Sequence, residues 1–195
     1  MAVEFQPDVE KVIAVVVYIA SKKVPELTPG KLFKLMFLAD KHHLVQYGRP
    51  ITGDRYNAMK DGPVPSLTYD LFKRQIMKTP FSAPGRQLAS KLAIDRGYEL
   101  PRISSQGDFD HDQLSKSDIA SIDKILDRYR NCTFAQLRAL THDMIAYENA
   151  WKGRRKKESV PMKFEDFFEE DEDAIVGTKD EVIENHILNT VFAKR

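Results

Sequence analysis

Asp40, His42 and His43 are the first side chains in the sequence that could do chemistry, because aspartate and histidine bind zinc and related metal ions. Neighbouring residues of a helix point about 100° apart, so the two histidines cannot both face one ion. A complete ligand set would need His111 or His142, brought close by folding. We therefore expect no bound metal, and interpret the pair as a buried polar anchor beside a surface histidine.

Nucleophilic chemistry has no better support. Cys132 is the only cysteine, and it directly precedes the predicted helix cap Thr133, with no histidine or aspartate partner apparent in the sequence. Ser66, Ser104 and Ser105 lack the G-x-S-x-G pattern of a nucleophile elbow. The chain also contains no phosphate-binding glycine loop and no dinucleotide-binding fingerprint. We expect no catalytic residue and no cofactor, and therefore a protein that is not an enzyme.

Asp40 also has an interpretation as a structural residue. It belongs to a predicted helix with a largely apolar face, and a carboxylate buried there must find hydrogen-bond donors. Backbone N–H groups of the elbow Gly62-Pro63-Val64, or the side chains of Lys60 or Arg55, could supply them. Such contacts would tie the helix to the elbow. The alternative is that Asp40 contacts a partner protein directly.

Helices must position most of these side chains. Apolar residues at helical spacing predict a helix from about Asp8 to Lys22, and a threonine followed by proline begins a second helix over Thr28–Tyr47. Prolines and glycines between Arg49 and Pro65 predict a short strand that ends in a rigid elbow. Ser66 then caps a third predicted helix.

The second half of the chain returns to helical patterns after an irregular stretch. Residues 87–95 predict a short helix, and residues 98–103 a second short strand that could pair with the first. Capping boxes at Ser115 and Thr133 open two further helices, and residues 145–151 predict one more helical turn. We expect a mainly α protein: a compact helical domain with a small two-stranded β element and a C-terminal helical extension.

The charge pattern changes after Trp151. A basic block over residues 152–157 precedes an acidic block, in which Phe164 and Phe168 would share one face of a helix because they are four residues apart. A capping box at Thr178 then opens a last predicted helix. We assign residues 1–151 to the domain and residues 152–195 to a charged linker and C-terminal helical extension.

Composition excludes several classes of protein. Of 195 residues, 42% are hydrophobic and 30% are charged, which is enough apolar content to bury a core. With 30 basic and 29 acidic residues the net charge is +1, so only a local patch could attract nucleic acid or anionic lipid. One cysteine permits no intrachain disulfide, and neither a secretory signal nor a membrane-spanning apolar run is apparent. We expect a cytoplasmic protein without membrane association.

Several motifs occur in a specific order along the chain. They are the helix Lys31–Asp40, the turn Tyr47–Pro50, the elbow Ala58–Pro65 and, later, Leu114–Ser117, Leu137–His142 and Ala150–Trp151. Together they resemble the Panacea domain, also called the SocA-like or phage-associated GepA-like family, over about Thr28 to Trp151. Met59 departs from the family pattern, which usually has an aromatic residue in the elbow. Residues 144–148 lengthen the gap before the tryptophan beyond the common spacing.

The resemblance implies a bacterial or phage-borne antitoxin that neutralises its cognate toxin by direct protein binding, without enzymatic activity. One branch of the family acts as an adaptor that delivers its toxin to a protease. The same domain is paired with many unrelated toxins, so the resemblance does not identify the toxin of this chain.

We therefore expect a groove beside the Gly62-Pro63 elbow to hold the toxin, and the acidic segment around Phe164 to help dock a basic partner. The candidate residues for partner binding, or for the family fingerprint alone, are Asp40, His43, Tyr56, Lys60, Asp61, Gly62, Pro63, Val64, Trp151, Phe164 and Phe168. Three alternatives stay open. A proteolytic adaptor would have a protease as second partner, a DNA-binding regulator would use the basic block, and a hydrolase would need a metal.

Overall fold

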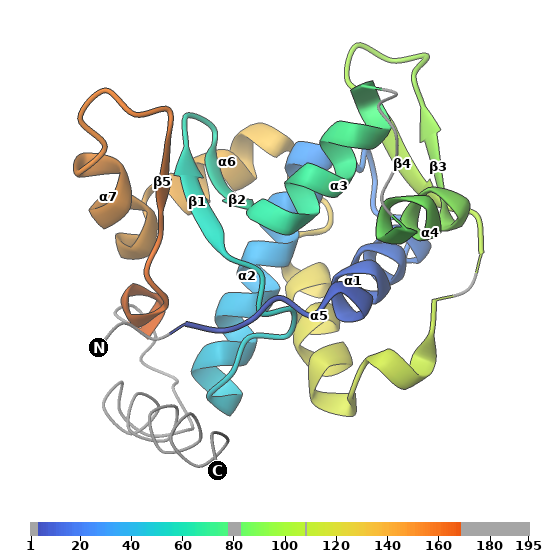
Figure 1. Cartoon of the computed structure of the whole chain (residues 1–195), viewed down its shortest axis with the longest axis horizontal. Coiled ribbons are helices and arrows are strands. Elements are labelled where there is room, and N and C mark those ends of the chain that lie inside the picture. Colours follow the sequence, from blue (N-terminus) through green and yellow to red (C-terminus); the bar gives the residue numbers. More distant parts are fainter. Residues whose placement is uncertain (1–3, 78–82, 108, 169–195) are drawn as a thin grey trace.

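The computed structural model describes residues 4–77, 83–107 and 109–168. Helix α2 (Pro29–Tyr47) lies in the middle of the molecule, between a small sheet on one side and α1 (Val9–Ser21) on the other (Figure 1). It contacts the largest number of other helices, so the core is built around it. The remaining helices are α3 (Ser66–Met77), α4 (Ala83–Lys91), α5 (Lys116–Tyr129), α6 (Phe134–His142) and α7 (Ile145–Lys152). The predicted mainly α fold is confirmed.

The first two helices begin and end where their sequence signals predict. The Asp8 side chain accepts a hydrogen bond from the Lys11 backbone N–H at 3.1 Å, and every residue of 12–20 is buried. Thr28 caps α2 in the same way, and Gly48 ends it in the left-handed conformation with φ 73°. A helix that is apolar around most of its circumference, as α1 is, must be covered on all sides.

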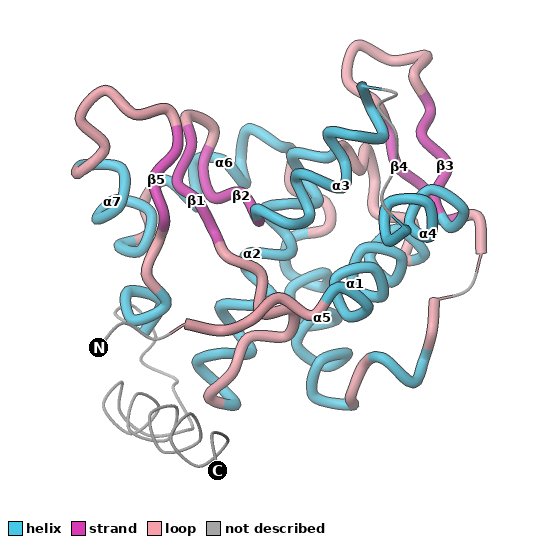
Figure 2. The backbone as a smooth tube through the Cα atoms, viewed as in Figure 1, coloured by secondary structure: helices cyan, strands magenta, loops and turns pink. Residues whose placement is uncertain are grey.

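In the described part of the chain, the strands form two separate antiparallel sheets rather than the single two-stranded element that we predicted (Figure 2). The first sheet has the order β2-β1-β5 and contains β1 (Tyr56–Met59), β2 (Gly62–Pro65) and β5 (Ser159–Pro161). The predicted elbow is itself strand β2, which pairs Pro63 with Ala58. Prolines are tolerated there because β2 is an edge strand.

The second sheet corrects two further predictions. It pairs β3 (Leu92–Asp95) with β4 (Arg102–Ser105), so the strand expected at 98–103 begins later and does not pair with β1. The helix expected over 87–95 lies earlier, in α4, and its last residues are strand β3. The side chains of Leu92 and Ile103 are buried by this pairing, and tertiary burial thus outweighs local helical spacing.

The chain after Trp151 contributes to the core. Strand β5 pairs with β1, and the 3₁₀-helix η2 (Phe164–Phe168) buries Phe164 and Phe167. The Phe167 ring lies 5.2 Å from that of Phe37, centroid to centroid. Residues three apart share a face in a 3₁₀-helix, so Phe167, and not Phe168, joins Phe164 in the core. The helix predicted after Thr178 lies outside the described residues, and the domain boundary at residue 151 stays a prediction.

None of the helices in the described part of the chain is both long enough and apolar enough to span a membrane.

Candidate partner-binding site

The β1–β2 hairpin is the part of the molecule in which most candidate residues lie. Its turn places Lys60 and Asp61 at an exposed tip, and Gly62 follows with φ 103°, a conformation that favours glycine. A Cβ atom on Gly62 would lie 2.8 Å from Lys34 Cε and 3.0 Å from Thr141 Oγ1. The hairpin can therefore approach α2 and α6 this closely only because residue 62 has no side chain.

Lys34 of α2 anchors the hairpin on its buried side. Its side chain is 1% exposed, and its Nζ donates a hydrogen bond to the Pro63 carbonyl oxygen at 2.8 Å. Burial lowers the pKa of Lys34 to about 7, since a buried ammonium loses its hydration. Sequence reasoning did not select this residue, although a lysine in the largely apolar run of α2 was a signal for it.

Two more helices fix the tip. Arg138 of α6 donates from Nε to Asp61 Oδ1 at 3.0 Å and from Nη2 to the Lys60 carbonyl at 3.3 Å. The Tyr147 hydroxyl of α7 donates to the Met59 carbonyl at 2.9 Å. Because α2, α6 and α7 each contact the hairpin through a different backbone carbonyl, its shape is set before any partner arrives.

Asp40 is buried and structural, but its donors are not those that we predicted. Its Oδ1 accepts from the backbone N–H groups of Ile51 and Thr52 at 2.9 and 3.0 Å. Its Oδ2 accepts from the Thr52 hydroxyl and, at 2.8 Å, from the Tyr56 hydroxyl. Burial nevertheless raises the pKa of Asp40 to about 6, because these hydrogen bonds offset only part of the lost hydration. Asp40 therefore ties α2 to the loop before β1. The contact with the elbow that we predicted for Asp40 is made instead by Lys34.

Asp54 makes a similar junction that the sequence analysis missed. Its carboxylate accepts from the backbone N–H groups of Leu67 and Thr68 at 2.9 and 3.0 Å, and from the Thr68 hydroxyl at 2.8 Å. The side chain thus caps α3 from outside the helix, in place of the predicted cap, Ser66. Its signal, an aspartate a dozen residues before a helix start, is not local and could not be recognised in the sequence.

His43 is a buried anchor between α2 and α5. Its Nδ1 lies 2.7 Å from the Arg49 carbonyl oxygen, and its Nε2 lies 3.1 Å from Asp118 Oδ1. Asp118 also pairs with Arg49 at 2.9 Å and with Lys11 at 3.3 Å. Burial alone would raise the pKa of Asp118, but hydrogen bonds from His43 and from Ser115 hold it well below its usual range.

Among the residues that the structure describes, no group of three or more histidine, cysteine, aspartate or glutamate side chains is placed to hold an ion. His42, the neighbour of His43, points toward Ser121 instead, with Nδ1 at 3.1 Å from its hydroxyl.

Trp151 belongs to a row of stacked side chains along α6 and α7. The His142 and Tyr147 rings lie 4.3 Å apart, the Tyr147 and Trp151 rings 5.8 Å apart, and the Arg154 guanidinium lies 4.4 Å from the Trp151 ring centre. Trp151 is half-buried and packs against the hydrophobic core, so part of its surface stays accessible. The row extends from the hairpin toward the connection between α7 and β5.

Comparison with known proteins decides the family. The family model described as "Antitoxin SocA-like, Panacea domain" matches residues 32–152. The chain belongs to this family. No curated protein and no solved structure matches the chain. The matched range of the Panacea domain runs from α2 to the end of α7, which confirms the resemblance found in the sequence.

Burial divides the candidate residues of this Panacea domain into two groups. Lys60 and Asp61 are exposed, and Val64, Trp151 and Phe168 are half-buried, so a partner can reach them. The others are buried and cannot touch a partner in this structure: Asp40, His43, Tyr56, Gly62, Pro63 and Phe164. The groups meet at the hairpin, where buried residues hold the exposed ones in place.

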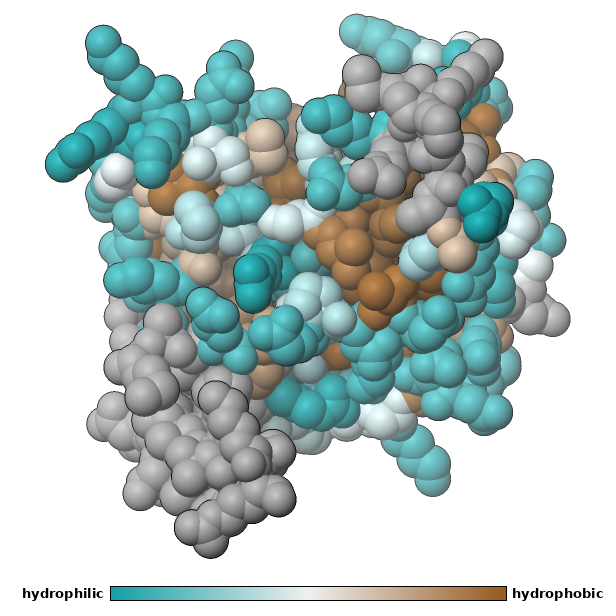
Figure 3. Space-filling view, in the orientation of Figure 1, coloured by the Kyte–Doolittle hydropathy of each residue, from teal (hydrophilic) through white to brown (hydrophobic). Residues whose placement is uncertain are grey.

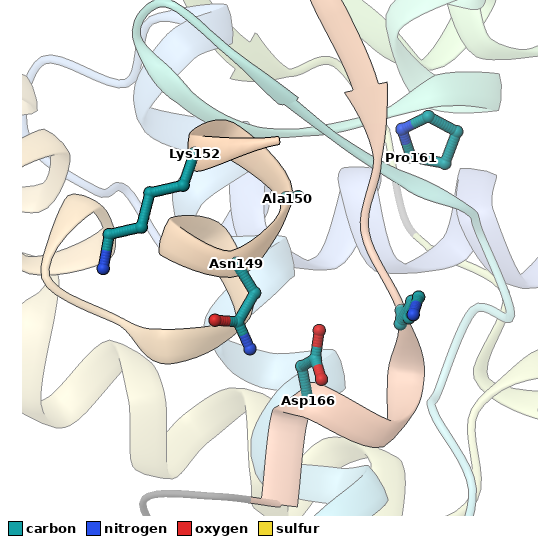
Figure 4. Close-up of a pocket in the computed structure, with 6 residues that line it drawn as sticks. Asn149, Ala150, Lys152, Pro161 and Asp166 are labelled. Atoms are coloured by element: carbon teal, nitrogen blue, oxygen red, sulfur yellow. The ribbon is translucent and has the colours of Figure 1, made fainter. Parts of the chain in front are cut away.

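A polar cleft of about 340 Å³ lies between α7, β5 and η2, next to the β1–β2 hairpin. The side chains of Asn149 and Asp166 face one another across it, and Pro161 and Lys163 complete its wall (Figure 4). Lys152 also lines the cleft, and its Nζ pairs with the carboxylate of Glu148.

Proposed function

We propose that this protein is an antitoxin that neutralises a cognate toxin by binding it directly, through the exposed side of the β1–β2 hairpin. We call this surface the hairpin face and define it by Lys60, Asp61, Val64, Arg138 and Trp151. Membership of the SocA-like antitoxin family supports the role, and the single observation that carries the choice of surface is the fixed geometry of the hairpin. The proposal includes a cytoplasmic location and no catalysis.

The physical advantage of such a surface is preorganisation. Association costs free energy when side chains and loops must be ordered on binding. The hairpin is already held by Lys34, Arg138 and Tyr147, so little of that cost remains. Trp and Arg, both present on the hairpin face, are the residue types that most often contribute strongly to binding at protein interfaces. A stable complex would bury about 800 Å² on each partner.

The experiment starts from the gene next to the one that encodes this chain. Its product should stop growth when expressed alone and lose this toxicity when this chain is co-expressed. Lys60→Glu should change the affinity of the purified complex by about tenfold or more, because it reverses a charge at the exposed tip. The matched control is Lys124→Glu, which makes the same change on an exposed residue of α5, away from the hairpin face. Equal affinity of the two variants would contradict the choice of surface, and no growth rescue by the wild type would contradict the function.

The same cells distinguish blocking from delivery to a protease. We propose blocking, so the half-life of the toxin should be unchanged or longer when this chain is present. A pulse-chase that shows faster loss of the toxin would instead support the adaptor function.

A further inference from the structure

The end of α7 and its connection to β5 form a strongly charged segment of the described chain. This basic loop, residues 152–158, contains Lys152, Arg154, Arg155, Lys156 and Lys157 and a single acidic residue, Glu158. It projects from the body at the corner where α7 and β5 meet, and Figure 3 shows a cluster of long hydrophilic side chains at this corner, at the upper left.

Most of this charge is not neutralised within the described structure. Lys152 pairs with Glu148, one turn earlier on α7. Arg155, Lys156 and Lys157 are exposed, and among the residues described none provides a carboxylate within ion-pair distance of them. Together with Arg154, they leave four cations available in four consecutive residues.

The basic loop also has a defined shape. The backbone N–H groups of Arg154 and Lys157 donate to the carbonyls of Trp151 and Arg154 at 3.2 and 2.9 Å. The Arg154 side chain stacks on the Trp151 ring, and its Nη1 donates to the Trp151 carbonyl at 3.1 Å. Strand β5 follows at once and is paired with β1. A stacked and hydrogen-bonded arginine presents its planar fork in one direction, which suits phosphate oxygens.

We propose that the basic loop binds the phosphate backbone of duplex DNA, as a second binding function next to the hairpin face, which it touches where Arg154 stacks on Trp151. DNA carries one negative charge per about 1.7 Å of helix axis, so a row of cations on a projecting loop gains free energy by releasing counterions. That gain needs no complementary apolar surface. The basic loop contains no apolar side chain, whereas a protein interface has an apolar or aromatic centre.

Duplex DNA fits better than a single strand. Single-stranded nucleic acids are held by bases that stack on open aromatic rings. Trp151 is the aromatic residue next to the basic loop, and its ring already stacks with Tyr147 and Arg154. With no helix or strand presented to a groove by this loop, the contacts should be to phosphates and should not read sequence.

The test measures the affinity of the purified full chain for three fluorescent probes over a range of salt: a mixed-sequence duplex, oligo-dT and poly-L-glutamate. Four phosphate contacts predict a slope of about −3.6 for log K against log salt, so duplex binding should weaken about 150-fold between about 50 and 200 mM salt. Oligo-dT should bind more weakly than the duplex, and poly-L-glutamate more weakly still.

The variant Arg155→Asn/Lys156→Ser/Lys157→Ser removes three of the four cations, and asparagine suits residue 155 because its φ is 52°. Its slope should fall to about −0.9, a weakening of only about threefold over the same salt range. The control Lys116→Ser/Lys124→Ser/Arg128→Ser removes three exposed charges from α5, on another side of the molecule, and should keep the wild-type slope. Thermal unfolding checks that both variants fold.

Three results would overturn the proposal. The first is a wild-type chain that does not bind the duplex at about 50 mM salt, and the second is an equal loss of affinity in the two triple variants. The third is binding of poly-L-glutamate as tight as that of the duplex with the same slope, which would assign the loop to an acidic protein surface. None of these measurements involves the toxin, so they leave the antitoxin function untouched.

Discussion

Asp40 makes the chain's stability depend on pH in a direction opposite to that of most acidic residues. Its pKa is about 6 in the folded protein and has the ordinary value of 3.8 in the unfolded chain. Well below pH 3.8 both states hold the proton. As the pH rises through the interval between the two values, the unfolded chain releases the proton first, so the folded state loses stability. The perturbation that isolates this effect is Asp40→Asn, which keeps the shape of the side chain and cannot ionise.

The magnitude follows from the two pKa values. A difference of about 2.2 units corresponds to about 3 kcal/mol, lost between about pH 4 and pH 7. In the variant, the amide oxygen can still accept from the Ile51 and Thr52 backbone N–H groups. The amide nitrogen can donate to the hydroxyl oxygens of Thr52 and Tyr56, which rotate from donor to acceptor. The substitution should therefore be least favourable in acid and become more favourable as the pH rises.

The assay is urea unfolding of both proteins at several pH values between about 3.5 and 7.5, followed by far-UV circular dichroism. The quantity of interest is the wild-type free energy of unfolding minus that of Asp40→Asn, in which contributions from other titrating groups cancel. It should fall by about 3 kcal/mol across the range. The exposed control Asp127→Asn should show little change. A difference that is flat, or that rises with pH, would refute the reasoning that burial outweighs the four hydrogen bonds of Asp40.

Three further variants test the framework by the same unfolding assay. Lys34→Met should behave in the opposite sense, because the pKa of Lys34 is lowered from 10.5 to about 7 in the folded protein. Relative to the variant, the wild type should gain about 3 kcal/mol of unfolding free energy between about pH 7 and pH 9.5. A difference that stays constant with pH would argue against a buried neutral amine. Gly62→Ala should cost roughly 1–3 kcal/mol, since it strains φ and crowds Lys34, and an unchanged urea midpoint would show that the hairpin can move away. Asp118→Asn should cost roughly 2 kcal/mol near neutral pH. Because the folded pKa of Asp118 lies below its usual range, that cost should shrink as the pH falls below about 4, and a cost independent of pH would be inconsistent with the pairing.

Local signals predicted the helices well. Asp8, Thr28 and Gly48 each act on backbone groups within three or four residues, so their effect can be recognised without knowing the fold. The capping boxes at Ser115 and Thr133 are present for the same reason.

Contacts between distant segments could not be predicted in this way. Strand β5 pairs with β1 across about a hundred residues, and its three residues have no alternating pattern. The partners of Asp40 show the limit most clearly. The sequence predicts that a buried carboxylate needs donors, but only the fold decides that they come from Ile51 and Thr52 rather than from the elbow.

The buried and exposed residues of the hairpin have different consequences for partner choice. Asp40, Gly62 and Pro63 belong to the motifs that mark the family, and all three are buried. A residue that a partner cannot touch does not distinguish one partner from another, so these motifs specify the framework. Under the proposed antitoxin function, discrimination between toxins must come from side chains that the framework exposes, such as Lys60 and Val64, because exchanging them alters the surface while the buried hydrogen bonds stay in place.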